Sequence, residues 1–460
     1  MNSADFATSL NLDDAGTEMY ALVSELYPIC RSITGGGVRE TLRILQSRIP
    51  LTIHEVPSGT PVFDWNIPRE WNIRDAWVKN AQGERVIDFR KSNLHVVSYS
   101  VPVRTRIPLE ELKKHLFTLP DHPDWIPYRT SYYAENWGFC LSHNELMQLK
   151  DGEYEVWIDA SLGKGHLTYG EYHLAGESAE EVLISCHVCH PSLCNDNLSG
   201  IALAVSLAQR LGQVKRRYSY RFLFTPGTIG SITWLSLNEA QLSRIKHGLV
   251  LACVGDSGKF TYKRTRRGNA EIDRAVAYVL RHAGYDHEIL NFSPYGYDER
   301  QFCSPAFNLP VGCFMRTPHG RFPEYHTSAD NLDLVRPQNL SDSFARCLSV
   351  LQVLESNKAY LNQNPKCEPQ LGKRGLYRTM GGETDGKSRE LAMLWLLNLS
   401  DGSHTLLDIA EESGLEFSLI LGARDALLQH GLLKERPDEA QPVADATRSD
   451  LQSWQISPIR

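Results

Sequence analysis

The sequence predicts an α/β protein in which a mixed sheet carries helices on both faces. A β-rich domain is inserted near its beginning, and a winged-helix-like domain lies near its end. Three observations support this prediction. Apolar runs alternate with helical patterns from residue 181 onward, short strand-like runs fill residues 51–167, and three amphipathic helical patterns followed by a short strand occupy residues 388–440.

Residues 1–50 are expected to form the N-terminal helices of the α/β domain. Apolar residues recur at helical spacing from Met19 to Ile29, and a second such pattern follows three consecutive glycines. Residues 51–167 form the predicted β-rich insertion, where runs such as 94–100 and 154–158 are separated by Pro, Gly, Asn and Asp.

Residues 168–361 are expected to complete the α/β domain. Apolar strand-like runs begin near residues 182, 220, 248 and 311, with helical stretches between them. In sheets of this kind the loops at the carboxyl ends of the strands carry the chemistry. Candidate functional residues are therefore sought where these runs end.

The C-terminal part is divided into a linker at 362–387, a winged-helix-like domain at 388–440 and a flexible tail at 441–460. A winged helix contacts DNA through its third helix. Residues 401–437 carry seven acids against three bases, which favours a packing or dimerisation role over DNA binding. A homo-oligomer is therefore a possible partner arrangement.

Composition narrows the class of partner further. The chain of 460 residues has a net charge of −7, which disfavours nucleic acid as the main ligand. The N-terminus resembles no secretory signal, and no apolar run reaches the roughly 20 residues that a bilayer requires. We therefore expect a cytoplasmic protein without a membrane partner, whose ten cysteines stay reduced.

The densest group of chemically active residues lies between Ile184 and Gly200. An apolar strand ends at His187, His190 follows in the same loop, and Asp196 precedes a helix of small residues. Imidazole and carboxylate ligands suit zinc. The alternative is that these side chains only cap the strand and the helix. The cysteines in this segment can also bind zinc, but no second cysteine pair follows, so they are interpreted as small buried residues (Cys186, Cys189 and Cys194).

A second group lies between Pro323 and Asp333. His326 stands in an aromatic and acidic loop with two aspartates close behind it, which makes it the third candidate ligand. In the alternative interpretation Thr327, Ser328 and Asp330 start the following helix, and this is compatible with a ligand role for His326.

These residues resemble the zinc aminopeptidase superfamily, whose phosphorylase/hydrolase-type fold would then be expected here. The closer likeness is to bacterial aminopeptidase-like proteins of unknown function with an inserted β-rich domain and a C-terminal winged helix. It rests on HVCHPSLCNDNLSG, FTPGTIGS, CVGD, EYHTSADNLD, RSITGGGVRETL and YGYDERQFCSP, and it covers nearly the whole chain. The resemblance implies that His187 and His326 are zinc ligands and that Asp196 is the carboxylate that bridges two metals in dizinc relatives.

The pattern then departs from that of working aminopeptidases, which carry two adjacent glutamates after the next strand. Gly227 and Thr228 stand there instead. A hydrolase still needs a base near the attacking water. Four acids are candidates for that role or for substrate binding, namely Asp256, Asp298, Glu299 and Glu324. Asp256 is also a possible ligand, and the 298–300 segment is alternatively an arginine-paired surface loop.

The resulting expectation is a zinc-dependent amide hydrolase with at most one well-occupied metal site. Its substrate would be a small peptide or an amino-acid amide, and ordinary aminopeptidase activity should be weak without the glutamate pair. Two alternatives stay open. One is a single-zinc acyl transferase or cyclase on the same fold, and the other is a binding protein that keeps the fold without turnover.

Overall fold

The computed structural model describes residues 12–284, 286–376 and 384–437. The chain divides into two compact units, the first ending at Ser356 and the second beginning at Asn357. Each unit is described here by itself.

The first unit is built on an eight-stranded mixed sheet with the order β1-β10-β12-β11-β13-β16-β14-β15. The strands β12, β11, β13 and β16 run parallel in its centre. Every residue of β11 and β12 is buried, because helices cover both faces of a parallel sheet. This explains why these strands read as continuous apolar runs. The bounds are β1 (Thr52–Pro57), β10 (His166–Leu174), β11 (Glu181–His187), β12 (Ser219–Thr225), β13 (Ile245–Leu251), β14 (Phe260–Lys263), β15 (His287–Leu290) and β16 (Val311–Met315).

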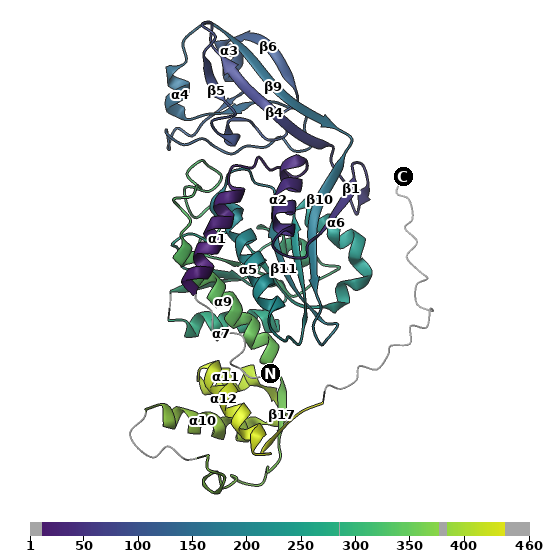
Figure 1. Cartoon of the computed structure of the whole chain (residues 1–460), viewed down its shortest axis with the longest axis vertical. Helices are drawn as coiled ribbons and strands as arrows, with labels where there is room; N and C mark the ends of the chain where they lie inside the picture. Colours follow the sequence, from purple (N-terminus) through teal and green to yellow (C-terminus); the bar gives the residue numbers. More distant parts are fainter. Residues whose placement is uncertain (1–11, 285, 377–383, 438–460) are drawn as a thin grey trace, which may run out of the picture. The chain divides into compact units, whose positions relative to one another are not determined.

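Helices lie on both faces of this sheet, as the sequence predicted. Figure 1 shows α1, α5 and α9 together on one side of the strands and α6 on the other. The helix α5 starts directly after the loop that follows β11, and the short helix α8 packs near α6. The bounds are α1 (Leu12–Leu26), α2 (Gly36–Gln46), α5 (Gly200–Gly212), α6 (Ile229–Asn238), α7 (Glu271–His282), α8 (Glu299–Phe302) and α9 (Pro337–Ser356).

The predicted β-rich insertion contains a four-stranded antiparallel sheet, β5-β4-β9-β6, formed by β4 (Glu70–Lys79), β5 (Arg85–Asp88), β6 (Val103–Pro108) and β9 (Glu153–Gly163). The expected limits of 51 and 167 are wider than this sheet. The strand β1 lies inside them but belongs to the large sheet, where it pairs antiparallel with β10. The insertion thus leaves the α/β domain after the edge strand β1 and returns to it at the neighbouring strand β10. Smaller elements complete it, namely β2 (Pro61–Val62), β3 (Trp65–Asn66), α3 (Leu109–Lys113), β7 (Leu116–Phe117), β8 (Phe139–Cys140) and α4 (His143–Gln148).

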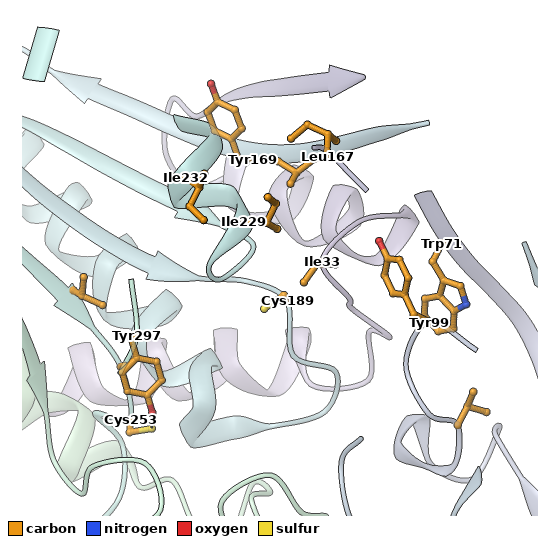
Figure 2. Close-up of a cluster of buried hydrophobic side chains, with 14 of the residues drawn as sticks. Ile33, Trp71, Tyr99, Leu167, Tyr169, Cys189, Ile229, Ile232, Cys253 and Tyr297 are labelled. Carbon is orange, nitrogen blue, oxygen red and sulfur yellow. Dashed lines mark hydrogen bonds between the residues drawn. The ribbon is translucent and has the colours of Figure 1, made fainter. Parts of the chain in front are cut away.

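One hydrophobic cluster joins the insertion to the α/β domain. Figure 2 shows Trp71 and Tyr99 of the insertion at one end of it and Tyr297 and Cys253 at the other, with Cys189 between them. All five side chains are at least nine-tenths buried. Because apolar burial is worth about 25 cal/mol per Å², the insertion is held as part of the first unit and not as a tethered module.

The second unit confirms the predicted winged helix. Three helices, α10 (Thr384–Leu399), α11 (Leu406–Ser413) and α12 (Phe417–Gln429), accompany a three-stranded sheet of β17 (Ala359–Asn362), β18 (Asp401–Thr405) and β19 (Leu433–Glu435). The limit expected at residue 361 differs from this arrangement, since β17 pairs with both β18 and β19. The expected linker of 362–387 also contains the start of α10. The expected tail, 441–460, lies outside the described residues.

No helix in the described ranges is both long and apolar enough to cross a membrane.

Candidate metal centre

The end of β11 delivers three potential metal ligands to one point. His187 is the last residue of this strand, and its Nε2 atom lies 2.9 Å from Asp196 Oδ1. His190 Nδ1 lies 3.2 Å from His187 Nε2 and 3.3 Å from Asp196 Oδ2. The ligand atoms of the three residues are all within 4.8 Å of one another. In the sequence, His190 belongs to the group that points to zinc, but the ligand set implied by the resemblance, His187, Asp196 and His326, leaves it out.

His326 reaches the same carboxylate from a different loop and lies beside His190, with the two ring centroids 4.9 Å apart. Its Nε2 lies 3.0 Å from Asp196 Oδ2, while the Tyr325 ring stacks on its imidazole with the centroids 3.9 Å apart. The three ligands expected from the sequence, His187, Asp196 and His326, are therefore brought together around Asp196. The sequence did not predict that His190 lies nearly as close to Asp196 as the other two histidines do. Its position three residues after His187, in a loop at the end of a strand, could have indicated a further ligand.

The residues fit a zinc ion. Zinc binds imidazole nitrogen and carboxylate oxygen at about 2.0–2.2 Å, so neighbouring ligands of a tetrahedral site stand roughly 3.3–3.5 Å apart. The separations of 2.9, 3.2 and 3.3 Å among His187, His190 and Asp196 are close to that value. Two imidazoles and one carboxylate would leave a fourth position open, as catalytic zinc sites do.

The charge states favour the same interpretation. Burial alone would raise the pKa of Asp196, but His190 and His187 hold it well below its usual range. Burial lowers the pKa of His190 to about 3. Burial also acts to lower the pKa of His187, yet the adjacent Asp196 raises it on balance. Ionised Asp196 and neutral His190 are in the state that binds a metal, whereas at His187 a metal ion would compete with the proton that Asp196 favours.

Hydrogen bonds to distant parts of the chain, made by Asp330 and by Asn197 of the loop itself, hold the Asp196 loop in place. Asp330 accepts hydrogen bonds from the backbone N–H groups of Asn195 (2.6 Å) and Asp196 (2.9 Å). Burial raises the pKa of this carboxyl to about 8, while the two N–H donors act to lower it. Asn197 donates from Nδ2 to the Leu251 carbonyl oxygen and accepts from the Cys253 N–H. The segment 323–333 therefore supplies both His326 and, through Asp330, the hydrogen bonds that position the Asp196 loop.

Asp256, which the sequence offered as a ligand or a base, instead helps to position the loop that carries Asp196. Its carboxylate accepts hydrogen bonds from Asn195 Nδ2 at 2.8 Å and from Thr317 Oγ1 at 2.7 Å. The three cysteines of the loop (Cys186, Cys189 and Cys194) are buried, and burial raises the pKa of each thiol. They are therefore protonated, as expected for small buried side chains.

A pocket of about 240 Å³ opens beside the histidines. It is lined by His187, His190 and His326 together with Asp298 and Arg300, while Tyr295 and Tyr325 contribute aromatic walls. Two other candidate acids stand elsewhere among the described residues. Glu299 is fully buried in an ion pair with Lys263, and Glu324 is half-buried outside the pocket lining.

Asp298 lies beside Gly227, the position where the resemblance described above leads one to expect a glutamate. A Cβ atom added to Gly227 would stand 3.7 Å from Asp298 Oδ1 and 3.2 Å from His187 Cβ. Ser231 Oγ donates to Asp298 Oδ1 at 3.1 Å, and Oδ2 has no hydrogen-bond partner among the described residues. Burial raises the pKa of Asp298 to about 6. A carboxylate thus occupies the space beside Gly227 although residue 227 itself has no side chain.

Comparison with known proteins agrees with the fold and places the chain in a family. The fold is aminopeptidase-like. A zinc aminopeptidase from Bacillus subtilis superposes with a TM-score of 0.54 at 13% identity, covering 73% of this chain and 94% of that one. The family described as a domain of unknown function (DUF4910) matches residues 20–357, and a winged helix-turn-helix family matches residues 358–435. The chain belongs to the DUF4910 family.

Two relatives from Clostridium acetobutylicum cover almost the whole chain. One is named "Putative polysaccharide biosynthesis protein with aminopeptidase-like domain" and is 57% identical over 424 residues, which are 92% of this chain and 98% of the relative. The other is a crystal structure described as that of a "putative peptidase". It has a TM-score of 0.89 and 55% identity, and it covers 93% of this chain and 98% of that one.

Proposed function

We propose that this protein is a zinc-dependent amide hydrolase in which Asp298 performs the proton transfer that a glutamate at position 227 performs in working aminopeptidases. The observation that carries the proposal is the position of the Asp298 carboxylate, 3.7 Å from the place of a Cβ on Gly227 and in the same pocket as the three histidines.

The zinc ion would be held by His187, His190 and Asp196, with His326 at the second oxygen of Asp196. Bound there, it would polarise the amide carbonyl and lower the pKa of a water molecule, which are the two services that zinc gives to hydrolases. This assignment replaces His326 with His190 as the third ligand. The contact of His190 with both His187 (3.2 Å) and Asp196 (3.3 Å) supports it, whereas His326 lies 3.0 Å from Asp196 Oδ2, lines the pocket and has 32% of its side chain exposed.

Asp298 is placed to move the proton. Its Oδ1 is fixed by Ser231, and its Oδ2 keeps its lone pairs available among the described residues. It takes a proton from the attacking water and returns it to the amide nitrogen as the C–N bond breaks. The products are a carboxylic acid and an amine. General-base assistance of this kind contributes about a hundred- to a ten-thousandfold to the rate.

The descriptions of the relatives agree with amide hydrolysis as the class of reaction. One carries an aminopeptidase-like domain in its name, and the other is described as a putative peptidase. The first is also assigned to polysaccharide biosynthesis, which suggests that the amide of the substrate can belong to a sugar derivative. The proposal that the protein is a peptidase-like hydrolase does not depend on whether the substrate contains a sugar.

The test is amide hydrolysis by the purified protein before and after metal removal. Protein treated with a chelator should lose turnover of a panel of small amides, and one equivalent of zinc should restore it. The panel should contain amino-acid amides and N-acyl amino acids, and each should be offered with and without an added amine. Amine-containing products in place of hydrolysis would favour the acyl transferase alternative. Full zinc loading without any turnover would favour the binding-protein alternative.

A further inference from the structure

Arg300 is a cation of the pocket whose charge acts on Asp298 and helps to lower the pKa of that carboxyl, without an ion pair between the two. It follows Asp298 by two residues in α8 and lines the same cavity of about 240 Å³. In the part of the chain that the structure describes, its side chain makes no hydrogen bond or ion pair, and its buried Nε–H has no acceptor. A guanidinium carries five donors that match a carboxylate in pairs, so an unpaired arginine in a pocket is suited to an anionic ligand.

The carboxylates around the pocket are already engaged, so they can neither pair with Arg300 nor bind a positively charged substrate. Asp196 is surrounded by His187, His190 and His326, and Glu299 is paired with Lys263. Asp298 is the one carboxylate among the lining residues. If Asp298 handles the proton, no lining carboxylate is left to bind the free ammonium group of an amino-acid amide.

We propose that the pocket takes a small amide that bears a carboxylate, of which an N-acyl amino acid is the simplest example, and that Arg300 binds this carboxylate. This inference rests on the proposed function and defines its substrate class. It also reverses the charge of the substrate expected from the sequence, an amino-acid amide with a free amine. A cavity of about 240 Å³ is of the size of a modified amino acid, and the Tyr295 and Tyr325 rings flank it.

Binding of three matched probes to the zinc-loaded protein tests the assignment. The probes are N-acetyl-L-alanine, N-acetyl-L-alaninamide and L-alaninamide, which differ in carrying a carboxylate, no charge or an ammonium group. We expect N-acetyl-L-alanine to bind most tightly by calorimetry. Arg300→Gln should weaken its binding about ten- to a hundredfold, because a charged hydrogen bond is worth about 1.5–3 kcal/mol. Arg300→Lys should lose less, since it keeps the charge and loses the paired geometry.

Controls separate this inference from the proposed function. Arg74→Gln removes an exposed arginine of β4 that pairs with Asp159 and should leave all three affinities unchanged. A preference for the carboxylate probe that Arg300→Gln abolishes supports the inference even in protein that hydrolyses nothing. The inference is overturned if the three probes bind equally, if none binds at millimolar concentration, or if Arg300→Gln leaves the preference intact, whether or not amides are hydrolysed.

Discussion

Asp196 is contacted by three imidazoles, and the identity of the third ligand can be decided by experiment at the level of single residues. The Nδ1 atom of His190 lies close to both His187 Nε2 and Asp196 Oδ2, whereas the Nε2 atom of His326 lies close to Asp196 Oδ2. We therefore expect His190 to be a zinc ligand and His326 to face the substrate.

We expect His190→Ala to lower the zinc content as far as His187→Ala does, because a site with two remaining ligands binds zinc weakly. His326→Ala should retain most of the zinc and reduce turnover. The measurement is elemental analysis after dialysis against a limiting zinc buffer, with His404→Ala in the second unit as a control histidine. Loss of zinc from His326→Ala with retention in His190→Ala would restore the ligand set that was expected from the sequence.

His247 makes the stability of the first unit depend on pH. It is buried in β13, and burial lowers its pKa to about 3, assisted by the charges of Arg217 and Lys246. Its Nε2 meets the Tyr218 hydroxyl at 3.3 Å. The unfolded chain takes up a proton near pH 6.5, but the folded chain does so only near pH 3.

The contribution of neutral His247 to stability is therefore present above pH 6.5 and is lost as the pH falls toward 3. The free energy of unfolding should decrease by about 1.4 kcal/mol per pH unit from this residue alone, well below pH 6.5. His247→Leu should flatten that part of the slope in urea denaturation at pH 7.5 and pH 5.5. An unchanged slope would show that His247 is protonated in the folded protein.

At the scale of elements, the segment 126–128 of the insertion forms a wall of the metal centre. The Tyr128 N–H donates to the His326 carbonyl oxygen at 2.8 Å, and the Ser328 N–H donates to the Ile126 carbonyl oxygen at the same distance. The Tyr128 ring packs edge-on against both His190 and His326. The insertion thus orients two of the histidines although it lies outside the α/β sheet.

Removal of this ring should weaken zinc binding. We expect Tyr128→Ala to reduce zinc affinity by about ten- to a hundredfold, which is typical of residues that orient metal ligands. Tyr128→Phe should stay within a few fold of the wild type, because it keeps the ring and loses only the contact with the Tyr132 hydroxyl. Competition with a coloured chelator measures both affinities. Equal losses in the two variants would assign the effect to the hydroxyl and not to the ring.

Local patterns in the sequence were enough to predict the elements that frame the site. The apolar run ending at His187 and the helix after Asp196 are both present, since burial on a parallel sheet imposes a continuous apolar strand. Pairings between distant segments were not predictable in this way. The strand β1 joins the large sheet through β10, and Asp298 reaches the space beside Gly227 from a different loop. Both depend on tertiary packing that no local periodicity encodes.

At the scale of the whole molecule, the second unit begins at Asn357, before the expected limit at residue 361. The choice of the end point of a truncated chain depends on this difference. The strand β17 (Ala359–Asn362) crosses the limit expected after residue 361 and is hydrogen-bonded to β18 and β19 of the second unit. A cut at residue 387 would leave β17 on the first fragment without either partner. An unpaired strand edge is a site of aggregation.

We therefore expect a chain of residues 1–356 to be monodisperse and to retain zinc binding, whereas a chain of residues 1–387 should aggregate. Light scattering and zinc content distinguish the two. Aggregation of both fragments would instead show that the first unit needs the winged helix, as expected if the latter packs on it or mediates a homo-oligomer. The oligomeric state itself stays a prediction.

The winged helix offers little to DNA within the described ranges. The third helix, α12, contains one arginine, Arg424, which is nearly buried and pairs with Asp425. Phosphate contacts require several exposed cations. We retain the expectation from the sequence that nucleic acid is not a partner.

The central claim is that Asp298 supplies the carboxylate that position 227 lacks, and turnover at matched zinc occupancy tests it most directly. The wild type and Asp298→Asn should be compared on the amide that the wild type hydrolyses fastest, each with one equivalent of zinc confirmed by elemental analysis. We predict that Asp298→Asn binds zinc normally and loses a hundred- to a ten-thousandfold in kcat, roughly the value of a general base. Asp298→Ala combined with Gly227→Glu, which returns a carboxylate to the same space, should recover part of that loss. Zinc-loaded Asp298→Asn with the turnover of the wild type would contradict the account.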